Sequence, residues 1–599
     1  MKRISLQGLN SGAEPELELD VAIVGGGVSG LYSGWRLLTA PNRPEKVHVF
    51  EMSDRIGGRL ESIQLPGMHF HGELGGMRYT TQHQIVTALI EKVFSAQLTP
   101  VPFSMGDPAT HYFYMRTQRF RANAWQQAQA ENSKFHSHYF LRPDLCGFSP
   151  DQLFNKIVYD VLLADPWFVQ NYAGKVSNPT RYDYRFQLTS EDWDSIKPRL
   201  TYGFPGPYHG MHVNDLGFWN VIKDQAGEEA FEYLGVAGGY YSNVANWNAA
   251  EAFPYMVGDF SNAATAYKTI AGGYDQTAYA LADAFLHQPG SAIWSQNRLV
   301  DFEITSAGPR RYALTVFNGQ SQKTWTVHAD AIILAMPRRS LELLNQFNFF
   351  FDPETQLQRH RHMASVIMEP AFKLLMGFEE PWWKEHFGCT SGESVTDLPM
   401  RQCYYFGTDA HDSHSLFLAS YNDMQSVPFW DVLESKDLEH WHPHPHKPHR
   451  IGTRTLEPQT WKKHSRWTPR ATALAPQHEV DKFLDVQAPA AMVREAMAQV
   501  RELHGNPHIP DPYITHFKNW TEDPFGAGYH AWKAGVNVAE VMRYMRCPEP
   551  AEAIHICGEA YSDQQGWVEG ALCVAERMLQ EHFALAWPEW LNPKYYLGW

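Results

Sequence analysis

The sequence contains no long hydrophobic run. Its longest apolar segments, such as residues 331–336, fall far short of the roughly 18–20 residues that a helix needs to cross a bilayer. Residues 1–20 contain no apolar stretch ahead of their first acidic residues, so no signal peptide is expected. These absences predict a cytoplasmic protein without a membrane partner.

Cysteine is scarce, and an excess of positive charge is absent. Six cysteines among 599 residues lack metal-ligand spacing, which predicts a reducing environment and no metal site. Fifty Lys and Arg residues face 66 Asp and Glu residues, and the formal charge of −16 disfavours nucleic acid as a partner. A chain of 599 residues exceeds one core of about 250–300 residues, so two or three domains are expected.

A glycine-rich turn follows the first strand-like segment. Residues 20–24 are apolar and rich in β-branched side chains, and Gly25, Gly27 and Gly30 then precede a helical stretch. In this G-x-G-x-x-G pattern the first glycine forms the tight turn, the second admits a pyrophosphate, and the third packs the helix on the strand. The pattern predicts a dinucleotide-binding unit, with phosphates at a helix N-terminus.

A second strand-like segment, residues 46–50, ends at Glu51. An acid at this distance from the glycines accepts hydrogen bonds from a ribose diol and repels a 2′-phosphate, so NADP is not expected. These two features alone leave NAD and FAD open.

Two further motifs resemble the flavin amine oxidase family, in its L-amino acid oxidase branch. Gly57-Gly58-Arg59 follows Glu51 in the manner of that family's second fingerprint, in which the glycine pair and the Arg lie at the diphosphate. Near the C-terminus, Gly558-Glu559 and Gly566-Trp567-Val568 resemble the partner half, which meets the diphosphate–ribityl chain and the flavin. The resemblance implies FAD, bound by both ends of the chain.

The resemblance also implies the fold, an α/β plus α+β arrangement. A discontinuous, Rossmann-like FAD-binding domain is expected over residues 17–66, 262–345 and 535–583. A mixed-sheet substrate-binding domain is expected over 67–145 and 346–534, with a helical insertion domain over 146–261. Within the FAD-binding domain, Val300 resembles the position whose backbone meets the adenine.

A third motif concerns the substrate carboxylate. Residues 73–79 resemble the flavin-adjacent turn of L-amino acid oxidases, which implies that Gly76, Met77 and Arg78 contact the cofactor and that Arg78 binds the carboxylate. A guanidinium pairs with a carboxylate through two parallel hydrogen bonds. The alternative is that Arg78 forms a structural ion pair with Glu73 or the FAD phosphates.

Residues 396–405 resemble a segment of animal venom L-amino acid oxidases in which a Tyr joins the Arg on the carboxylate. That role is assigned to Tyr405, and Tyr404 is expected to point to the opposite face of a strand. The alternative is a pair of core tyrosines.

Further positions match the family's substrate cage. Gly566 and Trp567 match the dipeptide whose Gly carbonyl accepts from the substrate amine, and Tyr529 and Trp567 match the two aromatic walls. Gly528 stands where monoamine oxidases carry a flavin-linking Cys, so the FAD is expected to be non-covalent. Lys373 resembles the family Lys that holds a water against flavin N5 and assists the reaction with oxygen.

The resemblance implies oxidation of free L-amino acids by hydride transfer from Cα to flavin N5, yielding 2-oxo acids, ammonia and hydrogen peroxide. The alternatives are an L-amino acid 2-monooxygenase, a polyamine or monoamine oxidase, and a flavoprotein without catalysis. The accepted side chains stay open, and a homodimer is a family expectation.

A stretch rich in His and Pro spans residues 439–450. Clustered His can bind metal, but alternating His and Pro in a polar loop is poorly suited to a closed site. It is therefore interpreted as an exposed insertion rather than a metal centre, and it contains His440, His442, His444, His446 and His449.

Overall fold

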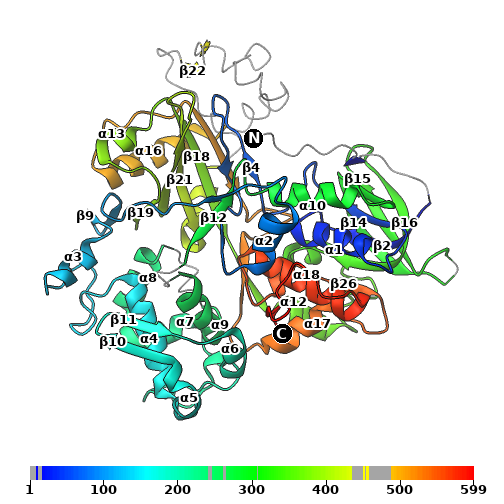
Figure 1. Cartoon of the computed structure of the whole chain (residues 1–599), viewed down its shortest axis with the longest axis horizontal. Coiled ribbons are helices and arrows are strands. Elements are labelled where there is room, and N and C mark those ends of the chain that lie inside the picture. The colour runs from blue at the N-terminus through cyan, green and yellow to red at the C-terminus, as the bar shows by residue number, and fades with distance from the viewer. Residues whose placement is uncertain are drawn as a thin grey trace.

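The computed structural model describes most of the chain, and Figure 1 shows its arrangement. The described residues are 9–10, 16–239, 246–260, 265–306, 308–434, 449–451, 454–456 and 487–599. The His-rich stretch falls outside them, apart from the backbone of residues 449–450 in the short strand β22 (His449–Ile451). None of the described helices is long and apolar enough to cross a membrane.

The first structural unit is an eight-stranded sheet that joins segments from both ends of the chain. β2 (Leu17–Val24) lies parallel to β3 (Val47–Phe50) and to β16 (Lys323–Leu334), and β16 also pairs in parallel with β26 (Ile554–Ile556). Apolar, β-branched strands of this kind are typical of a parallel sheet covered on both faces. The other strands are β1 (Leu9–Asn10), β13 (Ser291–Trp294), β14 (Asn297–Ile304) and β15 (Tyr312–Asn318).

Three helices form one layer against this sheet. α1 (Val28–Thr39) packs between α10 (Gln276–Leu286) and α18 (Val568–Phe583), as Figure 1 shows. Their apolar faces share one core, and residues beyond 583, including Leu591 and Leu597, join it. The first and last parts of the chain therefore form one folding unit.

The second unit is a seven-stranded sheet in the order β24-β18-β21-β20-β19-β8-β9. Every residue of β18 (Ala371–Phe378) is buried, and α16 (Ala490–His504) packs on β21 and β8. The remaining strands are β8 (Tyr112–Met115), β9 (Gln118–Arg121), β19 (Glu393–Thr396), β20 (Gln402–Thr408), β21 (Ser415–Asp423) and β24 (Ile514–Asn519).

The third unit is a helical cluster. It contains α4 (Pro150–Ala164), α5 (Pro166–Tyr172), α6 (Ser190–Ile196), α7 (Phe218–Ala226), α8 (Glu228–Ala237) and α9 (Ala249–Tyr255). Capping boxes at Ser149 and Thr189 satisfy free N–H groups at the starts of α4 and α6. The cluster's core also takes Trp125, Tyr139 and Leu145, which precede the expected start at residue 146.

A two-stranded ribbon lies between the units. β17 (Val366–Glu369) pairs antiparallel with β25 (Tyr529–Trp532), with Ile367 opposite Ala531 and Glu369 opposite Tyr529. Val366 and Trp532 belong to a core of the FAD-binding unit, whereas Ala531 belongs to the helical core, against which Ile367 packs. Because side chains alternate along a strand, the ribbon presents one face to each unit.

The remaining elements are short connections. A three-stranded sheet joins β6 (Tyr79–Thr80), β12 (Tyr267–Ile270) and β7 (Pro100–Pro102). The others are α2 (Gln84–Ala88), α3 (Ala124–Ala130), α11 (Arg338–Glu342), α12 (Leu357–Met363), α13 (Trp382–Phe387), α14 (Val427–Asp431), α17 (Val538–Arg546), β4 (Ser62–Ile63), β5 (Gly72–Glu73), β10 (Val176–Thr180), β11 (Asp183–Phe186) and β23 (Arg454–Leu456).

Candidate active site

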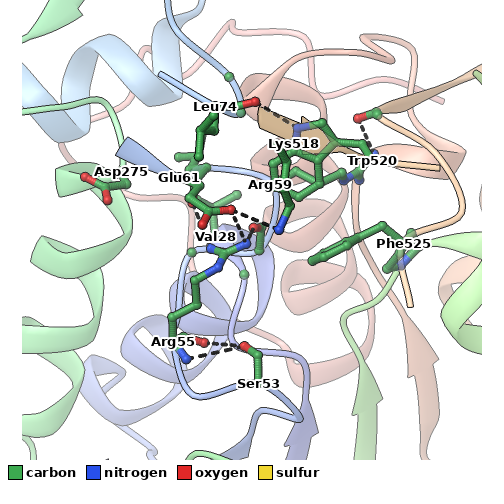
Figure 2. A pocket seen from close by; sticks show the side chains of 18 of the residues that line it. Val28, Ser53, Arg55, Arg59, Glu61, Leu74, Asp275, Lys518, Trp520 and Phe525 are labelled. Carbon is green, nitrogen blue, oxygen red and sulfur yellow. Dashed lines mark hydrogen bonds and ion pairs between the residues drawn. The ribbon is translucent and has the colours of Figure 1, made fainter. Parts of the chain in front are cut away.

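A cavity of about 1880 Å³ runs from the glycine-rich turn to the second sheet. Residues from both ends of the chain line it, as do residues of β18 and of the loop that follows β24. Figure 2 shows a part where Arg55, Arg59 and Lys518 gather around Glu61. Arg55 and Lys518 lie 3.2 and 3.3 Å from the Glu61 carboxylate, so both cations are held in ion pairs at this part of the lining.

The glycines of the first motif are required by close backbone approaches. Gly25 has φ +115°, and a Cβ on it would lie 2.3 Å from the carbonyl oxygen of Ala335. A Cβ on Gly30 would lie 2.0 Å from the Gly25 carbonyl oxygen, so the third glycine packs the helix against the turn. Gly27 and Gly58 face each other, since a Cβ on Gly58 would lie 3.3 Å from the Gly27 Cα. The lining here is bare backbone, which a pyrophosphate can approach.

Glu51 lines the cavity and closes this turn. Its carboxylate accepts from the Gly26 N–H at 2.8 Å, and from the N–H and hydroxyl of Ser53 at 2.9 and 2.8 Å. These bonds fix the carboxylate beside the glycine-rich turn, where the sequence predicted a ribose contact. Whether Glu51 binds ribose stays a prediction.

A buried ion pair links the N-terminal and C-terminal motifs. Arg59 Nη2 lies 2.8 Å from Glu559 Oε2, and Arg59 Nη1 donates to the Gly528 carbonyl at 3.0 Å. Glu559 also accepts from the N–H groups of His530 and Gly566, both at 2.8 Å. Burial opposes ionisation, but Arg59 and then His530 hold the pKa of Glu559 well below its ordinary range. This network orients the turn that carries Gly566.

The region around α18 fits a flavin. Gly76, Met77, Gly558 and Trp567 line the cavity, as does Val568, the first residue of α18. The positive end of a helix dipole stabilises negative charge nearby. The pairing of this helix terminus with the bare glycine turns fits FAD.

One expected cofactor residue does not itself line the cavity. Val300 is absent from the residues that line the cavity, and its carbonyl accepts from the Asn345 N–H at 3.2 Å. The pairing of β14 with β15 shifts register between Leu299 and Asp301, which interrupts the regular alternation of side chains between the two faces of the sheet. Asn297, Arg298 and Leu299 line the cavity, and the contact of the neighbouring Val300 backbone with the adenine stays a prediction.

Arg78 is a nearly buried cationic side chain of the cavity lining that contacts two aromatic rings. It is 8% exposed, lines the cavity, and lies 4.3 Å from the ring centre of Tyr267 and 5.4 Å from that of Phe103. Its Nη1 donates to Met105 Sδ at 3.0 Å. The sequence signalled Arg78, but the rings that hold it come from other segments.

Glu73, the alternative partner of Arg78, is engaged elsewhere. It accepts from the Ser62 hydroxyl at 2.6 Å and from the Tyr274 N–H at 2.8 Å. Burial, and then the charge of Asp275, raises the pKa of Glu73. Its bonds therefore tie β5 to the start of α10.

Tyr405 does not lie with Arg78. Its hydroxyl pairs with Ser394 Oγ at 2.7 Å and with His504 Nε2 at 2.8 Å, inside the core of the second sheet. Tyr404 belongs to the cluster that includes Met77, and its ring lies 6.5 Å from that of Phe103. The two tyrosines do face opposite ways, but the role given to Tyr405 is a register error, and Tyr404 lies on the Arg78 side.

Lys373 projects from β18 into the cavity. Its Nζ donates to the carbonyl oxygens of Gly75 at 2.6 Å and Glu73 at 3.3 Å, and lies 4.6 Å from the ring centre of Tyr421. Burial, opposed by Glu73 and assisted by Arg78, lowers the pKa of Lys373 to about 7. This amine therefore changes protonation near neutral pH.

The turn at Gly566 is surrounded by aromatic rings. A Cβ on Gly566 would lie 3.4 Å from Tyr529 and 3.5 Å from the Tyr255 hydroxyl, and Trp567 packs edge-on against His83. Tyr255 ends α9 and belongs to a helical region in which no motif singled out a pocket residue. It could not be found from the sequence, because only folding brings α9 to this turn.

Gly528 has no room for a side chain. A Cβ there would lie 2.4 Å from the Cβ of Ala371. A linking Cys at this position would therefore require the first residue of β18 to move.

One group of metal-ligand residues forms far from the cavity lining. Cys547, His555 and His582 bring ligand atoms within 4.8 Å of one another. The two imidazole rings stack with their centres 4.9 Å apart, and His555 Nδ1 pairs with the Arg546 carbonyl at 3.1 Å. The sequence did not signal this group, because its members come from three separate elements.

The chain belongs to the flavin-containing amine oxidoreductases. The family model described as "Flavin containing amine oxidoreductase" matches residues 28–440, more than half of the chain. FAD is therefore its cofactor, and oxidation of an amine is its general chemistry.

Similar proteins carry several different names. Aplysianin-A from Aplysia kurodai is 22% identical over 589 residues, covering 94% of this chain and 90% of that protein. Achacin from Lissachatina fulica is 21% identical over 586 residues, covering 96% and 94%. The L-amino-acid oxidase of Crotalus adamanteus is 23% identical over 436 residues, covering 72% and 71%.

Solved structures share the fold. Putrescine oxidase bound to putrescine superimposes with a TM-score of 0.58 at 16% identity, covering 95% of this chain and all of that one. Cyclohexylamine oxidase from Brevibacterium oxydans gives 0.54 at 17% identity, covering 94% and 99%.

Proposed function

We propose that this protein oxidises the α-amino group of free L-amino acids, using non-covalently bound FAD. The products are the 2-oxo acid, ammonia and hydrogen peroxide. The resemblance to L-amino-acid oxidases at 23% identity supports the substrate class, and the space denied to a side chain at Gly528 supports non-covalent attachment.

The observation that carries the proposal is Arg78. Arg78 is nearly buried, lines the cavity beside the flavin-facing turn, and carries a planar guanidinium that matches a substrate carboxylate in shape and charge. The rings of Tyr267 and Phe103 hold it in place before substrate arrives. An enzyme that acts on simple amines has no carboxylate to bind.

The remaining groups orient the substrate. The Gly566 carbonyl accepts from the neutral amine. Glu559 accepts from the Gly566 N–H and so helps to position this residue. Tyr529, Trp567 and Tyr255 form the walls and exclude water. FAD, held by the glycine turns and the start of α18, would supply the hydride acceptor and the route for electrons to oxygen. Orientation of this kind supplies much of the rate enhancement.

Lys373 serves the half-reaction in which oxygen reoxidises the reduced flavin. Its amine is held by the carbonyls of Gly75 and Glu73 beside the flavin-adjacent turn, where it can keep a water in place and support oxygen reduction. The half-reaction in which the substrate reduces the flavin requires no side-chain base if the amine binds deprotonated.

The test is an anaerobic flavin-reduction screen over the twenty L-amino acids, followed by product analysis in air. We expect bleaching of the flavin by a subset of them, with one 2-oxo acid and one peroxide per turnover. An amide with carbon dioxide would identify a 2-monooxygenase instead. Reduction by putrescine or monoamines alone would exclude amino acids as substrates.

A further inference from the structure

Glu369, at the end of β17, is a fully buried acid without a hydrogen-bond partner. Its side chain is 0% exposed, and neither carboxylate oxygen has a partner among the described residues. Buried polar groups in native proteins are nearly always satisfied, so an exception calls for a missing ligand or a functional role. Burial, and then the charge of Asp423, raises the pKa of Glu369 to about 8.

The ribbon formed by β17 and β25 directs Glu369 toward the substrate side. His530 binds Glu559 on the FAD side, together with Trp532. The alternate residues, Glu369 and Tyr529, share the other face and lie directly opposite each other. Tyr529 lines the cavity beside Gly566, and the Glu369 carboxyl lies on the same face of the ribbon, buried behind the residues that line the cavity.

A second acid approaches from the neighbouring sheet. Asp423 is the last residue of β21, is 1% exposed, and pairs with Ala371 on β18. Ala371 and Lys373 line the cavity, as does Tyr421, which lies two residues before Asp423 and so on the same face. Asp423 acts on the charge of Glu369, so two buried carboxyls from different strands lie near each other behind the cavity lining.

We propose that Glu369, with Asp423 beside it, binds a positive charge at the end of the substrate side chain, so that the preferred substrates are cationic amino acids. This inference rests on the proposed function and extends it. Arg78 then holds the carboxylate at one end of the substrate, and Glu369 holds an ammonium or guanidinium at the other. A cation beside Glu369 favours the ionised carboxylate, whereas a neutral chain of equal length leaves the acid buried without a hydrogen-bond partner.

The experiment compares each cationic amino acid with a neutral isostere. Wild-type kcat/KM from anaerobic flavin reduction is measured for L-lysine against L-norleucine, and for L-arginine against L-citrulline. We expect each cationic substrate to exceed its isostere by about 30- to 100-fold. Equal or reversed ratios in the wild type overturn the inference, and this arm needs no variant.

The Glu369→Gln variant then locates the effect. It should lower kcat/KM for lysine and arginine about 30- to 100-fold, while norleucine changes less than threefold. The control is Glu552→Gln, at an ion pair with Arg311. It should leave the lysine-to-norleucine and arginine-to-citrulline ratios of kcat/KM unchanged. Melting temperature and flavin content verify that the variant folds.

The outcomes separate the two proposals. An equal loss with lysine and norleucine in Glu369→Gln shows a structural role for Glu369 and overturns the inference. Reduction by neutral amino acids alone overturns the inference and leaves the proposed function standing. No reduction by any amino acid overturns both.

Discussion

The two ends of the cavity are built in different ways. At the dinucleotide end, short motifs present bare backbone, and Gly25, Gly27 and Gly58 leave room that side chains would fill. At the substrate end, side chains from separate elements converge, and Arg78, Tyr255 and Tyr529 share no motif. The dinucleotide end suits the cofactor, which is the same throughout the family. The side chains of the substrate end determine which substrate fits. Variants at the two ends should therefore fail differently.

The largest effect is expected from Gly25→Ala. A methyl group there meets the Ala335 carbonyl at 2.3 Å in a backbone conformation with φ +115°. We expect FAD-free protein and a loss of about 3 kcal/mol in the free energy of unfolding. Flavin absorbance and thermal unfolding measure both. Gly319→Ala, where the nearest atom lies 3.5 Å from the added carbon, is the matched control and should retain FAD.

Lys373→Met should slow the reaction with oxygen by about 100-fold while sparing flavin reduction, because a nearby positive charge stabilises developing negative charge. Burial lowers the pKa of Lys373 to about 7, so its charge is present below pH 7 and lost above. Reoxidation in stopped flow should therefore slow as pH rises through 7 in the wild type only.

Lys518→Met is the control for this experiment, since Lys518 lines the cavity at Glu61. An equal slowing of reoxidation in both variants would assign the effect to general charge rather than to Lys373.

A smaller effect should distinguish the two tyrosines. Tyr404→Phe should raise KM for amino acids about tenfold, because Tyr404 lies on the Arg78 side. Tyr405→Phe should leave KM unchanged and lower the free energy of unfolding by ~1–2 kcal/mol, since its hydroxyl bonds Ser394 and His504. The reverse pattern would restore the role predicted for Tyr405.

The smallest effect concerns acid stability. The pKa of Glu559 lies below its ordinary value of 4.5, so its contribution is complete above pH 4.5 and is lost as pH falls further. Glu559→Gln should flatten the decline of the melting temperature between about pH 5 and pH 3. If the melting temperature of the variant declined with pH as steeply as that of the wild type, Glu559 would not contribute to acid unfolding.

The sequence predicted one end of the cavity much better than the other. Gly25, Glu51, Arg59 and Glu559 lie where short motifs implied, because each motif is a local strand, turn and helix. At the substrate end, Tyr405 lies in the core of the second sheet, on the face of β20 opposite to that of Tyr404, because adjacent residues of a strand point to opposite faces.

Other features depend on long-range packing. Tyr255 reaches the cavity through the placement of α9, and Glu369 lies opposite Tyr529 through the pairing of β17 with β25; nothing in their local sequence signals either position. The contact between Arg78 and the Tyr267 ring also depends on long-range packing, since the two residues lie far apart in the sequence. Side chains drawn from distant segments require the fold before they can be recognised.

The most direct test of the central claim compares an amino acid with the amine that lacks its carboxylate, in the wild type and in Arg78→Met. With the best amino acid substrate, we predict that wild-type kcat/KM for anaerobic flavin reduction exceeds that of the decarboxylated amine by about 1,000-fold. In Arg78→Met, with FAD still bound, that ratio should fall to near one. Equal reaction of amine and amino acid in the wild type, or an unchanged ratio in the variant, would contradict the assignment of Arg78 to the substrate carboxylate.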